Sequence, residues 1–374
     1  MSRIIGLLAL VSLYQVKLNS AEFIPLGYLN GYTSTSAATG VSADGRVVVG
    51  ASYDASSNSV PFRWTPENGM QSIGTLGGST AAWGVSGDGT KITGNNGVDG
   101  FIWTQATGIQ NISKPAGHNQ TMPMAISLDG STLVGYGNSD SFRWTVGNGF
   151  ETVGLVNAQG VSSDGQVVVG SFNSTASYWT NASGSISLGT LSGGTASFAR
   201  GISDDGKVIV GSSGVTGGNT HAFRWSQADG IQDIVGLSGF TSSVALAASS
   251  DGQMIIGYSS KGAVDSQTAF VWTKEYGIID LSKFLQDQGN ATISSWTGLN
   301  IPRDITGDNI TGYNIAGVGT SNGQRQAFLL RGFTVPEPAT YIMCLIIVGM
   351  LYGIYQLRNQ HDQLRLLNQN GMQK

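Results

Sequence analysis

Residues 40–78 read GVSADGRVVVGASYDASSNSVPFRWTPENGMQSIGTLGG, and this stretch contains every part of a phrase that recurs along the chain. Small residues lead into a Ser-x-Asp-Gly turn, a β-branched run ends in Gly, and Phe-x-Trp is followed by Gly and a short apolar run. Successive turn aspartates are 35 to 46 residues apart, a period typical of propellers and solenoids. The repeated turns are Asp44-Gly45, Asp88-Gly89, Asp129-Gly130, Asp164-Gly165, Asp205-Gly206 and Asp251-Gly252. The repeated aromatic positions are Trp64, Trp103, Trp144, Trp179, Trp225 and Trp272.

A seventh copy departs from the phrase. Thr311-Gly312 replaces the Asp-Gly pair, Tyr313–Gly317 replaces the β-branched run, and Phe328-Leu329-Leu330 replaces Phe-x-Trp. The repeat region therefore contains seven units.

Each unit predicts four short strands. In the second unit these are Ala81–Ser86, Thr90–Thr93, Phe101–Thr104 and Ile109–Ile112. We expect Asp88-Gly89 to form a two-residue type I′ hairpin turn, because both residues tolerate positive φ. Four strands in about 40 residues is the size of a propeller blade.

The two ends of the repeat region predict a closed ring. Phe23–Leu29 resembles the fourth strand of a unit, as in Met70–Leu76, yet it precedes any first strand. The last unit stops after its third strand, near Arg331, so the N-terminal strand can complete it and leave no open edge. We predict an all-β, seven-bladed β-propeller over residues 22–332. The alternative is a β-solenoid, which needs no borrowed strand.

Two repeated features admit both a functional and a structural interpretation. The Phe-x-Trp pairs resemble a row of ligand-stacking aromatics, but residues i and i+2 of a strand share one face, which predicts packing between blades. The repeated aspartates resemble calcium ligands, but one per unit is too few for a shell of about six to eight oxygens. The turns explain them, and we predict no metal and no cofactor.

One insertion interrupts the repeat before the last unit. It reads LSKFLQDQGNATISSWTGLNIPRDI and predicts a short helix that is capped by Ser282, runs to about Gln288 and stops at Gly289. Trp296 lies in the insertion, outside the register of the repeated tryptophans. The insertion either decorates one face of the ring or fills space before closure.

Composition and charge limit the ligands. Charged residues make up only 11% of the chain, and 55 of the 374 residues are Gly. Across Glu22–Pro338, 14 lysine and arginine residues stand against 22 aspartate and glutamate residues, a net charge of about −8. This balance argues against nucleic acid and other polyanions as partners. Cys344 is the only cysteine, so the repeat region has no disulfide and no thiolate metal site.

The two ends of the chain predict export and anchoring. Residues 1–21 combine Arg3, the apolar run Ile4–Tyr14 and a small-residue cleavage point, the layout of a signal peptide; a short N-terminal anchor is the alternative. Residues 339–357 are 19 uncharged residues, long enough for a transmembrane helix. Arg358 and Arg365 follow, which predicts a cytoplasmic tail over residues 358–374 and a repeat domain on the outside.

The repeat resembles the HAF family of extracellular repeat proteins over about Glu22–Gly332. The family's His-Ala-Phe phrase stands once in full, as His221-Ala222-Phe223-Arg224-Trp225, and in part as Ala269-Phe270 and Ala327-Phe328. The resemblance implies an extracellular location, but the family has no settled activity.

The C-terminal segment resembles a PEP-CTERM sorting signal. In the linker 333–338, Val335, Pro336, Glu337 and Pro338 form the motif that precedes the apolar segment. The resemblance implies processing by an exosortase-type protease, a host that makes extracellular polysaccharide, and release to the surface or matrix after cleavage. The tail departs from the family pattern, because dispersed charges run on to Lys374 after the first arginine.

No pattern in the sequence indicates catalysis. HExxH, paired His or Cys spacings and a phosphate-binding loop are all absent, and only His118 and His221 could serve a Ser-His-Asp triad. A glycoside-cleaving site needs two carboxylates about 5–9 Å apart. The acids outside the repeat register, which would have to supply them, include Asp54, Glu151, Glu275 and Asp304.

The sequence as a whole predicts an exported, surface-anchored, non-catalytic binding or structural module of the cell envelope or extracellular matrix. Aromatics outside the repeat register suit contact with a glycan such as exopolysaccharide: Tyr53, Trp83, Tyr136 and Trp296. The alternatives are a passive spacer or adhesin-like surface protein and a polysaccharide lyase or hydrolase.

Overall fold

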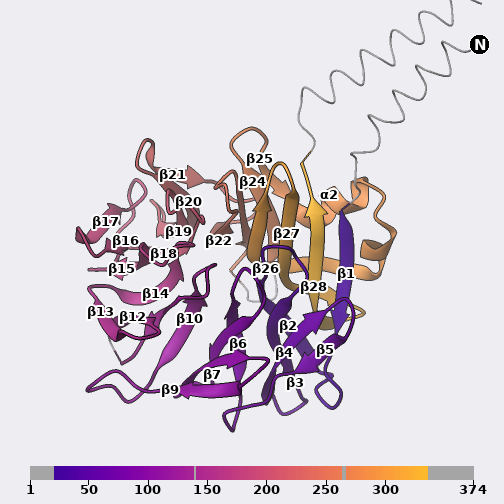
Figure 1. Cartoon of the computed structure of the whole chain (residues 1–374). Coiled ribbons are helices and arrows are strands. Elements are labelled where there is room, and N and C mark those ends of the chain that lie inside the picture. Colours follow the sequence, from indigo (N-terminus) through magenta and orange to yellow (C-terminus); the bar gives the residue numbers. More distant parts are fainter. Residues whose placement is uncertain (1–20, 139, 263–266, 336–374) are drawn as a thin grey trace, which may run out of the picture. The chain divides into compact units, whose positions relative to one another are not determined.

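The computed structural model describes residues 21–138, 140–262 and 267–335. Seven antiparallel four-stranded sheets form the blades of a β-propeller, which confirms the predicted fold class (Figure 1). Blade 1 comprises β2 (Thr35–Val41), β3 (Val48–Tyr53), β4 (Ser59–Thr65) and β5 (Gly69–Ser72). Blade 2 comprises β6 (Ala81–Val85), β7 (Lys91–Asn95), β8 (Gly100–Thr104) and β9 (Gly108–Ile112). Blade 3 comprises β10 (Met122–Ile126), β11 (Thr132–Tyr136), β12 (Ser141–Thr145) and β13 (Gly149–Val153).

The remaining blades follow the same plan. Blade 4 comprises β14 (Val156–Val161), β15 (Val168–Phe172), β16 (Thr175–Thr180) and β17 (Gly184–Gly189). Blade 5 comprises β18 (Ser197–Ile202), β19 (Val208–Gly214), β20 (Thr220–Ser226) and β21 (Gly230–Ile234). Blade 6 comprises β22 (Ser242–Ala248), β23 (Met254–Ser260), β24 (Thr268–Thr273) and β25 (Gly277–Asp280). Blade 7 comprises β26 (Trp296–Asp308), β27 (Gly312–Ser321), β28 (Gln324–Phe333) and, from the other end of the region, β1 (Glu22–Gly27).

Strand β1 closes the ring as its outermost strand in blade 7. It pairs antiparallel with β28, with Glu22 opposite Arg331 and Phe23 opposite Leu330, so the indigo and yellow strands lie side by side (Figure 1). Arg331 Nε donates to Glu22 Oε2 at 3.0 Å. The borrowed strand removes the open edge that blade 7 would otherwise present.

Each Ser-x-Asp-Gly turn is held by its own side chains. In blade 2, Ser86 Oγ donates to Asp88 Oδ1 at 2.6 Å and accepts the backbone N–H of Lys91 at 3.0 Å. The N–H of Gly89 donates to the carbonyl of Ser86 at 2.8 Å, so the central residues of the turn are Gly87 and Asp88. The predicted type I′ turn is wrong, because only Gly89 has positive φ, 70°.

A β-bulge interrupts the inner strand of every blade. In blade 5, Ala199 pairs with Gly211 and Gly201 pairs with Val210, which leaves Arg200 unpaired between them. The bulge brings the carbonyl of Phe198 to the place where a Cβ on Gly211 would stand. The repeated glycine that ends each β-branched run therefore leaves room for the bulge, and the bulge redirects one side chain.

The core lies between neighbouring blades. Val47 and Val49 of blade 1 pack with Ile92 and Phe101 of blade 2 in one continuous buried cluster. Of the repeated tryptophans, Trp64, Trp103 and Trp179 are buried, whereas Trp144, Trp225 and Trp272 are half-buried against such clusters. The Phe-x-Trp phrase thus supplies packing between blades.

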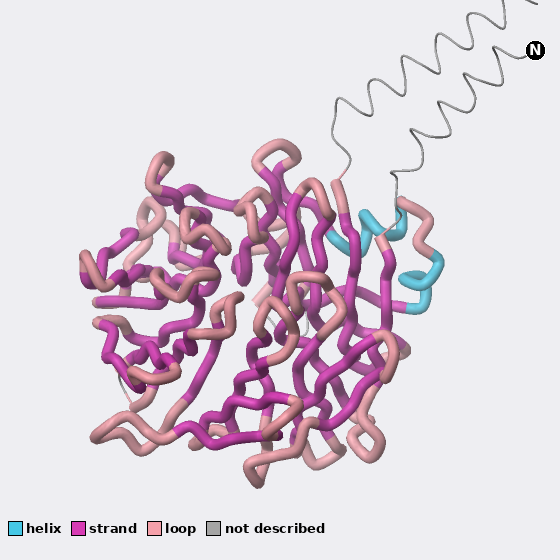
Figure 2. The backbone as a smooth tube through the Cα atoms, in the orientation of Figure 1, coloured by secondary structure: helices cyan, strands magenta, loops and turns pink. Residues whose placement is uncertain are grey.

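Blade 7 has the longest strands and is covered at one edge by α2 (Leu281–Asp287) and the 3₁₀ helix η1 (Ala291–Ser295), the cyan elements in Figure 2. The helix cap is Asp280, which accepts the N–H of Lys283 at 3.0 Å; the predicted cap Ser282 instead accepts the N–H of Leu299 at 2.8 Å. Trp296 is only 4% exposed and packs edge-on against Phe23, so its predicted role in ligand contact is wrong.

Several predicted features lie outside the described residues. These are most of the signal peptide, Pro336, Glu337 and Pro338 of the sorting motif, the predicted transmembrane helix over 339–357 and the tail. Within the described ranges, no helix is both long enough and apolar enough to span a bilayer.

Candidate functional site

The two faces of the propeller differ in construction. All inner strands run toward the face that carries the Ser-x-Asp-Gly turns, here called the turn face. Loops between the second and third strands and the connectors between blades lie on the opposite face, and they vary in length and sequence. Loops that vary on a rigid scaffold are where binding residues are disproportionately found.

The turn face is tied together around the axis by backbone hydrogen bonds. The N–H of Ala43 donates to the carbonyl of Gly87 at 3.0 Å, and the N–H of Gly87 donates to the carbonyl of Leu128 at 2.8 Å. Ser163 N–H likewise donates to the carbonyl of Asp204 at 3.0 Å. These bonds therefore link the turns of neighbouring blades.

The bulged residues form a ring around the central channel. Each stands five positions before the turn aspartate of its blade, or before Asp308 in blade 7. The ring consists of Thr39, Trp83, Met124, Gln159, Arg200, Leu246 and Arg303, and all seven line one cavity of about 230 Å³. This position carries a different kind of side chain in almost every blade, while the residues on either side of it are Ala, Gly or Pro except for Asp304.

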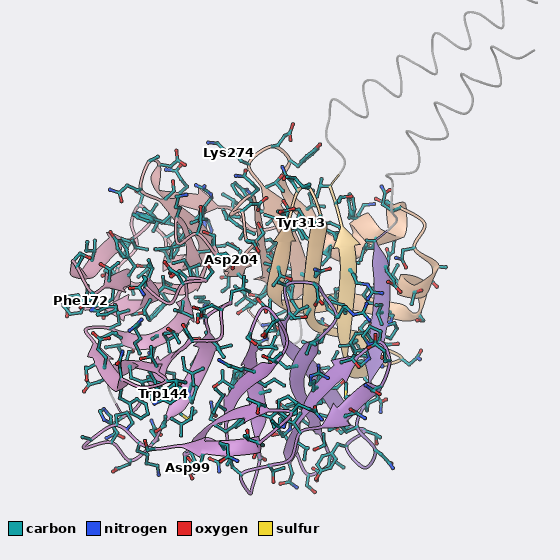
Figure 3. The ribbon with its side chains drawn as sticks, in the orientation of Figure 1. Asp99, Trp144, Phe172, Asp204, Lys274 and Tyr313 are labelled. Atoms are coloured by element: carbon teal, nitrogen blue, oxygen red, sulfur yellow. The ribbon has the colours of Figure 1, made fainter. Side chains whose placement is uncertain are left out.

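Two carboxyl groups lie nearer the turn face in the same cavity. Asp304 accepts the backbone N–H groups of Val41 and Ile305, both at 2.9 Å. Burial raises the pKa of Asp304 to about 7 despite these bonds, and the neighbouring Asp204 raises it further. Burial also raises the pKa of Asp204, which lies near the middle of the ring of blades (Figure 3).

A larger cleft of about 890 Å³ opens on the opposite face between blades 6 and 7. Its walls are cross-linked: Asn300 Nδ2 donates to the carbonyl of Gln267 at 3.1 Å, and Thr320 Oγ1 donates to Asn300 Oδ1 at 2.8 Å. Phe240 forms one side, with Lys261 Nζ 5.2 Å from its ring centre. Other lining residues are Asp280, Lys283, Gln286, Thr297 and Arg325. The cleft is therefore prearranged and mainly polar.

Few of the site residues predicted from the sequence line either cavity. The turn aspartates and glycines are distributed around the turn face, and the repeated tryptophans lie between blades. Among the off-register aromatics, Trp83 lines the channel and its buried Nε1 has no hydrogen-bond partner. Asp304 alone among the four off-register acids named above lies in the channel wall.

Neither histidine of the described chain lies in these cavities. His221 Nδ1 pairs with Asp233 Oδ2 at 3.0 Å across β20 and β21, and His118 Nε2 is 3.7 Å from Asp140 Oδ2. Among the described residues, no group of three or more His, Cys, Asp or Glu side chains is arranged to hold a metal.

Sequence reasoning missed the ring residues Arg200, Leu246 and Arg303, and it missed Arg325. The available signal was the fixed spacing of five residues before each turn aspartate. That spacing identifies one position per blade. The direction of the side chain at that position depends on a β-bulge, which strand alternation alone does not reveal.

Comparisons with known proteins agree on the fold. No protein-family model and no curated protein matches the chain. The structure resembles virginiamycin B lyase from Staphylococcus aureus, with 12% identity and a TM-score of 0.53 over 83% of this chain and 99% of that one. It also resembles an oligogalacturonate lyase in complex with manganese, with 10% identity and a TM-score of 0.52 over 85% and 97% of the two chains.

A third likeness is to the extracellular domain of a protein described as a one-component system from B. thetaiotaomicron. The identity is 14% and the TM-score 0.54, over 83% of this chain and 40% of that one. At such low identities these likenesses show the propeller fold and leave the activity open.

Proposed function

We propose that the protein is an exported, surface-anchored, non-catalytic module that binds polysaccharide on the face opposite the turns. The observation that carries this proposal is the cleft between blades 6 and 7. Its volume of about 890 Å³ falls in the range of ligand sites, roughly 300–1,000 Å³.

The lining of the cleft supports a glycan as the ligand. Amide, hydroxyl and charged side chains from α2, β26 and β27 surround it, and Phe240 supplies an aromatic wall. Sugars present hydroxyl groups around an apolar ring face, so they need such a mixture of polar groups and one aromatic surface. The hydrogen bonds of Asn300 and Thr320 hold the wall before any ligand arrives.

Anchoring and sorting are part of the proposal and rest on the sequence. The signal-peptide pattern, the VPEP motif of residues 335–338 and the apolar segment 339–357 support an exosortase-type protease as a partner and the membrane as the attachment. In this proposal the propeller works outside the cytoplasmic membrane, either anchored or released after processing.

The absence of catalysis is also a proposal, and two contacts support it. His221 is engaged by Asp233 across adjacent strands, and Asp304 is held by two backbone N–H groups. His221 lines neither cavity, and Asp304 lines the channel instead of the cleft in which the glycan is proposed to bind.

The test is binding and cleavage measured together. Full-length protein in mild detergent is incubated with polysaccharide isolated from its host, and pull-down, new reducing ends and new unsaturated ends are recorded. We expect retention of the polysaccharide without new ends. Asn300→Ala and Gln286→Ala should weaken retention, while Asn68→Ala on the turn face, outside the cleft, should not.

New ends in the wild-type reaction would replace the binding module with a lyase or hydrolase. Neither retention nor cleavage would leave the passive surface spacer as the better description.

A further inference from the structure

The arginines of the propeller fall into two groups. Four form ion pairs with carboxylates: Arg46 with Glu67, Arg143 with Glu151, Arg224 with Asp229 and Arg331 with Glu22. In contrast, four arginines form no ion pair with a described carboxylate: Arg63, which is on β4 and lines neither cavity, and Arg200, Arg303 and Arg325. The described chain has more acidic than basic residues, so a shortage of acids does not explain this.

Three of these unpaired arginines line the two cavities: Arg200 and Arg303 line the channel, in a part here called the channel mouth, and Arg325 lines the large cleft. The bulges of β18 and β26 turn Arg200 and Arg303 into the same cavity. Arg325 is the second residue of β28, at the opposite face, and lines the large cleft. Arg303 and Arg325 also interact with each other, so the channel mouth adjoins the cleft.

The surroundings of Arg303 are electrostatically unfavourable. Burial lowers the pKa of its guanidinium, and the like charges of Arg325 and Arg200 lower it further, while the Tyr258 and Tyr53 phenols oppose the shift. Burial raises the pKa of Tyr53, and Arg303 and Arg325 lower it. Arg200 and Arg303 line one cavity, and Arg325, Tyr53 and Tyr258 lie near enough to act on Arg303. The carboxyl groups in that cavity, Asp204 and Asp304, form no ion pair with these arginines. Unpaired, partly desolvated charges of one sign are costly unless an opposite charge joins them.

We propose that the channel mouth binds the carboxylate of an acidic sugar whose neighbouring sugars occupy the cleft, so that the ligand is a sparsely acidic glycan. This inference rests on the proposed function. A guanidinium matches the planar carboxylate with two parallel hydrogen bonds, and Tyr53 and Tyr258 can add O–H donors.

The size and charge of the site restrict the ligand further. The channel cavity of about 230 Å³ accepts an end group, whereas the cleft of about 890 Å³ accepts several sugars. The carboxyl groups of Asp204 and Asp304 line the same cavity nearer the turn face, and they disfavour an anion at that end when they are ionised. The net negative charge of the repeat region as a whole disfavours a densely charged polymer.

The test compares one polymer with and without its carboxylates. Full-length protein is titrated with gellan, which has a single glucuronate in each repeat, with carboxyl-reduced gellan, and with free glucuronate. We expect gellan to bind roughly 10- to 100-fold more tightly than its reduced form, the usual effect of a charge-assisted hydrogen-bond pair. Arg303→Gln and Arg200→Gln should remove this preference, and Arg46→Gln, on the turn face, should keep it.

Each outcome separates the inference from the proposed function. Equal binding of gellan and reduced gellan overturns the carboxylate site and leaves the glycan module standing. Arg303-dependent binding of glucuronate alone, with neither polymer bound, overturns the glycan module and keeps an anion site. No binding of any probe overturns both.

Discussion

The turn face and the channel mouth are built from the same repeated unit, yet their polar groups behave in opposite ways. On the turn face Ser86, Asp88 and Gly89 bond to one another, and blades 1 and 3 to 6 repeat this arrangement. At the mouth, Arg200 and Arg303 differ from their counterparts Thr39 and Leu246 and form no ion pair with a described carboxylate. The repeated turn side chains satisfy one another, whereas the variable ring position carries an arginine without an ion pair in blades 5 and 7.

The largest loss of stability is expected from a substitution at the glycine opposite a β-bulge. Gly211→Val should destabilise the fold by about 4 kcal/mol or more, because the new Cβ overlaps the carbonyl of Phe198 and the Phe223 ring. Chemical unfolding measures the loss. Gly298→Ala is the matched control, since a Cβ there meets nothing within 4 Å. Equal losses in both variants would contradict the role of the close approach.

A pH titration sharpens the contrast inside the channel. Burial raises the folded pKa of Asp304 from 3.8 to about 7, so the folded state holds a proton that the unfolded chain has released. Stability should therefore fall as pH rises from 3.8 to about 7, by about 3 kcal/mol at roughly 1.4 kcal/mol per pKa unit, reduced for solvent access.

Asp304→Asn should remove most of that fall in urea unfolding compared at about pH 5 and about pH 8. Asp204, whose pKa burial also raises, should leave a smaller residual slope. An unchanged slope in Asp304→Asn would show that this carboxyl is solvated in the folded protein.

The turns should contribute a smaller stability that is lost as pH falls, whereas the contribution of Asp304 is lost as pH rises. Ser162→Ala removes the donor to Asp164 and the acceptor of the Val167 N–H, and should cost about 2 kcal/mol. The Ser162 hydroxyl lowers the pKa of Asp164, so that stability is present above the ordinary value and lost in acid; the variant should lose this acid sensitivity. Exposed Ser183→Ala is the control, and a loss as large as that of Ser162→Ala would contradict the turn's importance.

Removing a polar side chain at the channel mouth should stabilise the fold, whereas removing one in a turn should destabilise it. Arg303→Met should raise thermal stability slightly, because it removes the repulsion between the Arg303 guanidinium and those of Arg325 and Arg200. Arg46→Met, which breaks only an exposed ion pair, should change stability by less than about 0.5 kcal/mol. Destabilisation by Arg303→Met would mean that the arginine supports the fold instead of awaiting a ligand.

The sequence predicted the ring and its closure because both depend on local signals. The Asp-Gly spacing marks each inner hairpin, and Phe23–Leu29 has the pattern of an outer strand without a hairpin before it. The site depends on geometry that those signals do not contain. Arg303 points into the channel because Pro302 and Asp304 pair on either side of it, a register known only from the sheet.

Trp296 shows the same limit from the other direction. It has no place in the repeat register, which made it a candidate for ligand contact. The long strands of blade 7 and the closing strand bury it against Phe23 and Phe328. The burial of Trp296 therefore depends on β1, a strand from the opposite end of the propeller region.

That closing strand also sets an order of events during synthesis. Among the strands of the propeller, β1 leaves the ribosome first and its partner β28 leaves last. The paired residues Glu22 and Arg331 are 309 residues apart. Until then β1 is an unpaired strand, and such long-range pairing folds slowly. Pro25 lies in the middle of β1 and has no backbone N–H to donate. While β1 is unpaired, this proline disfavours pairing with a strand of another chain.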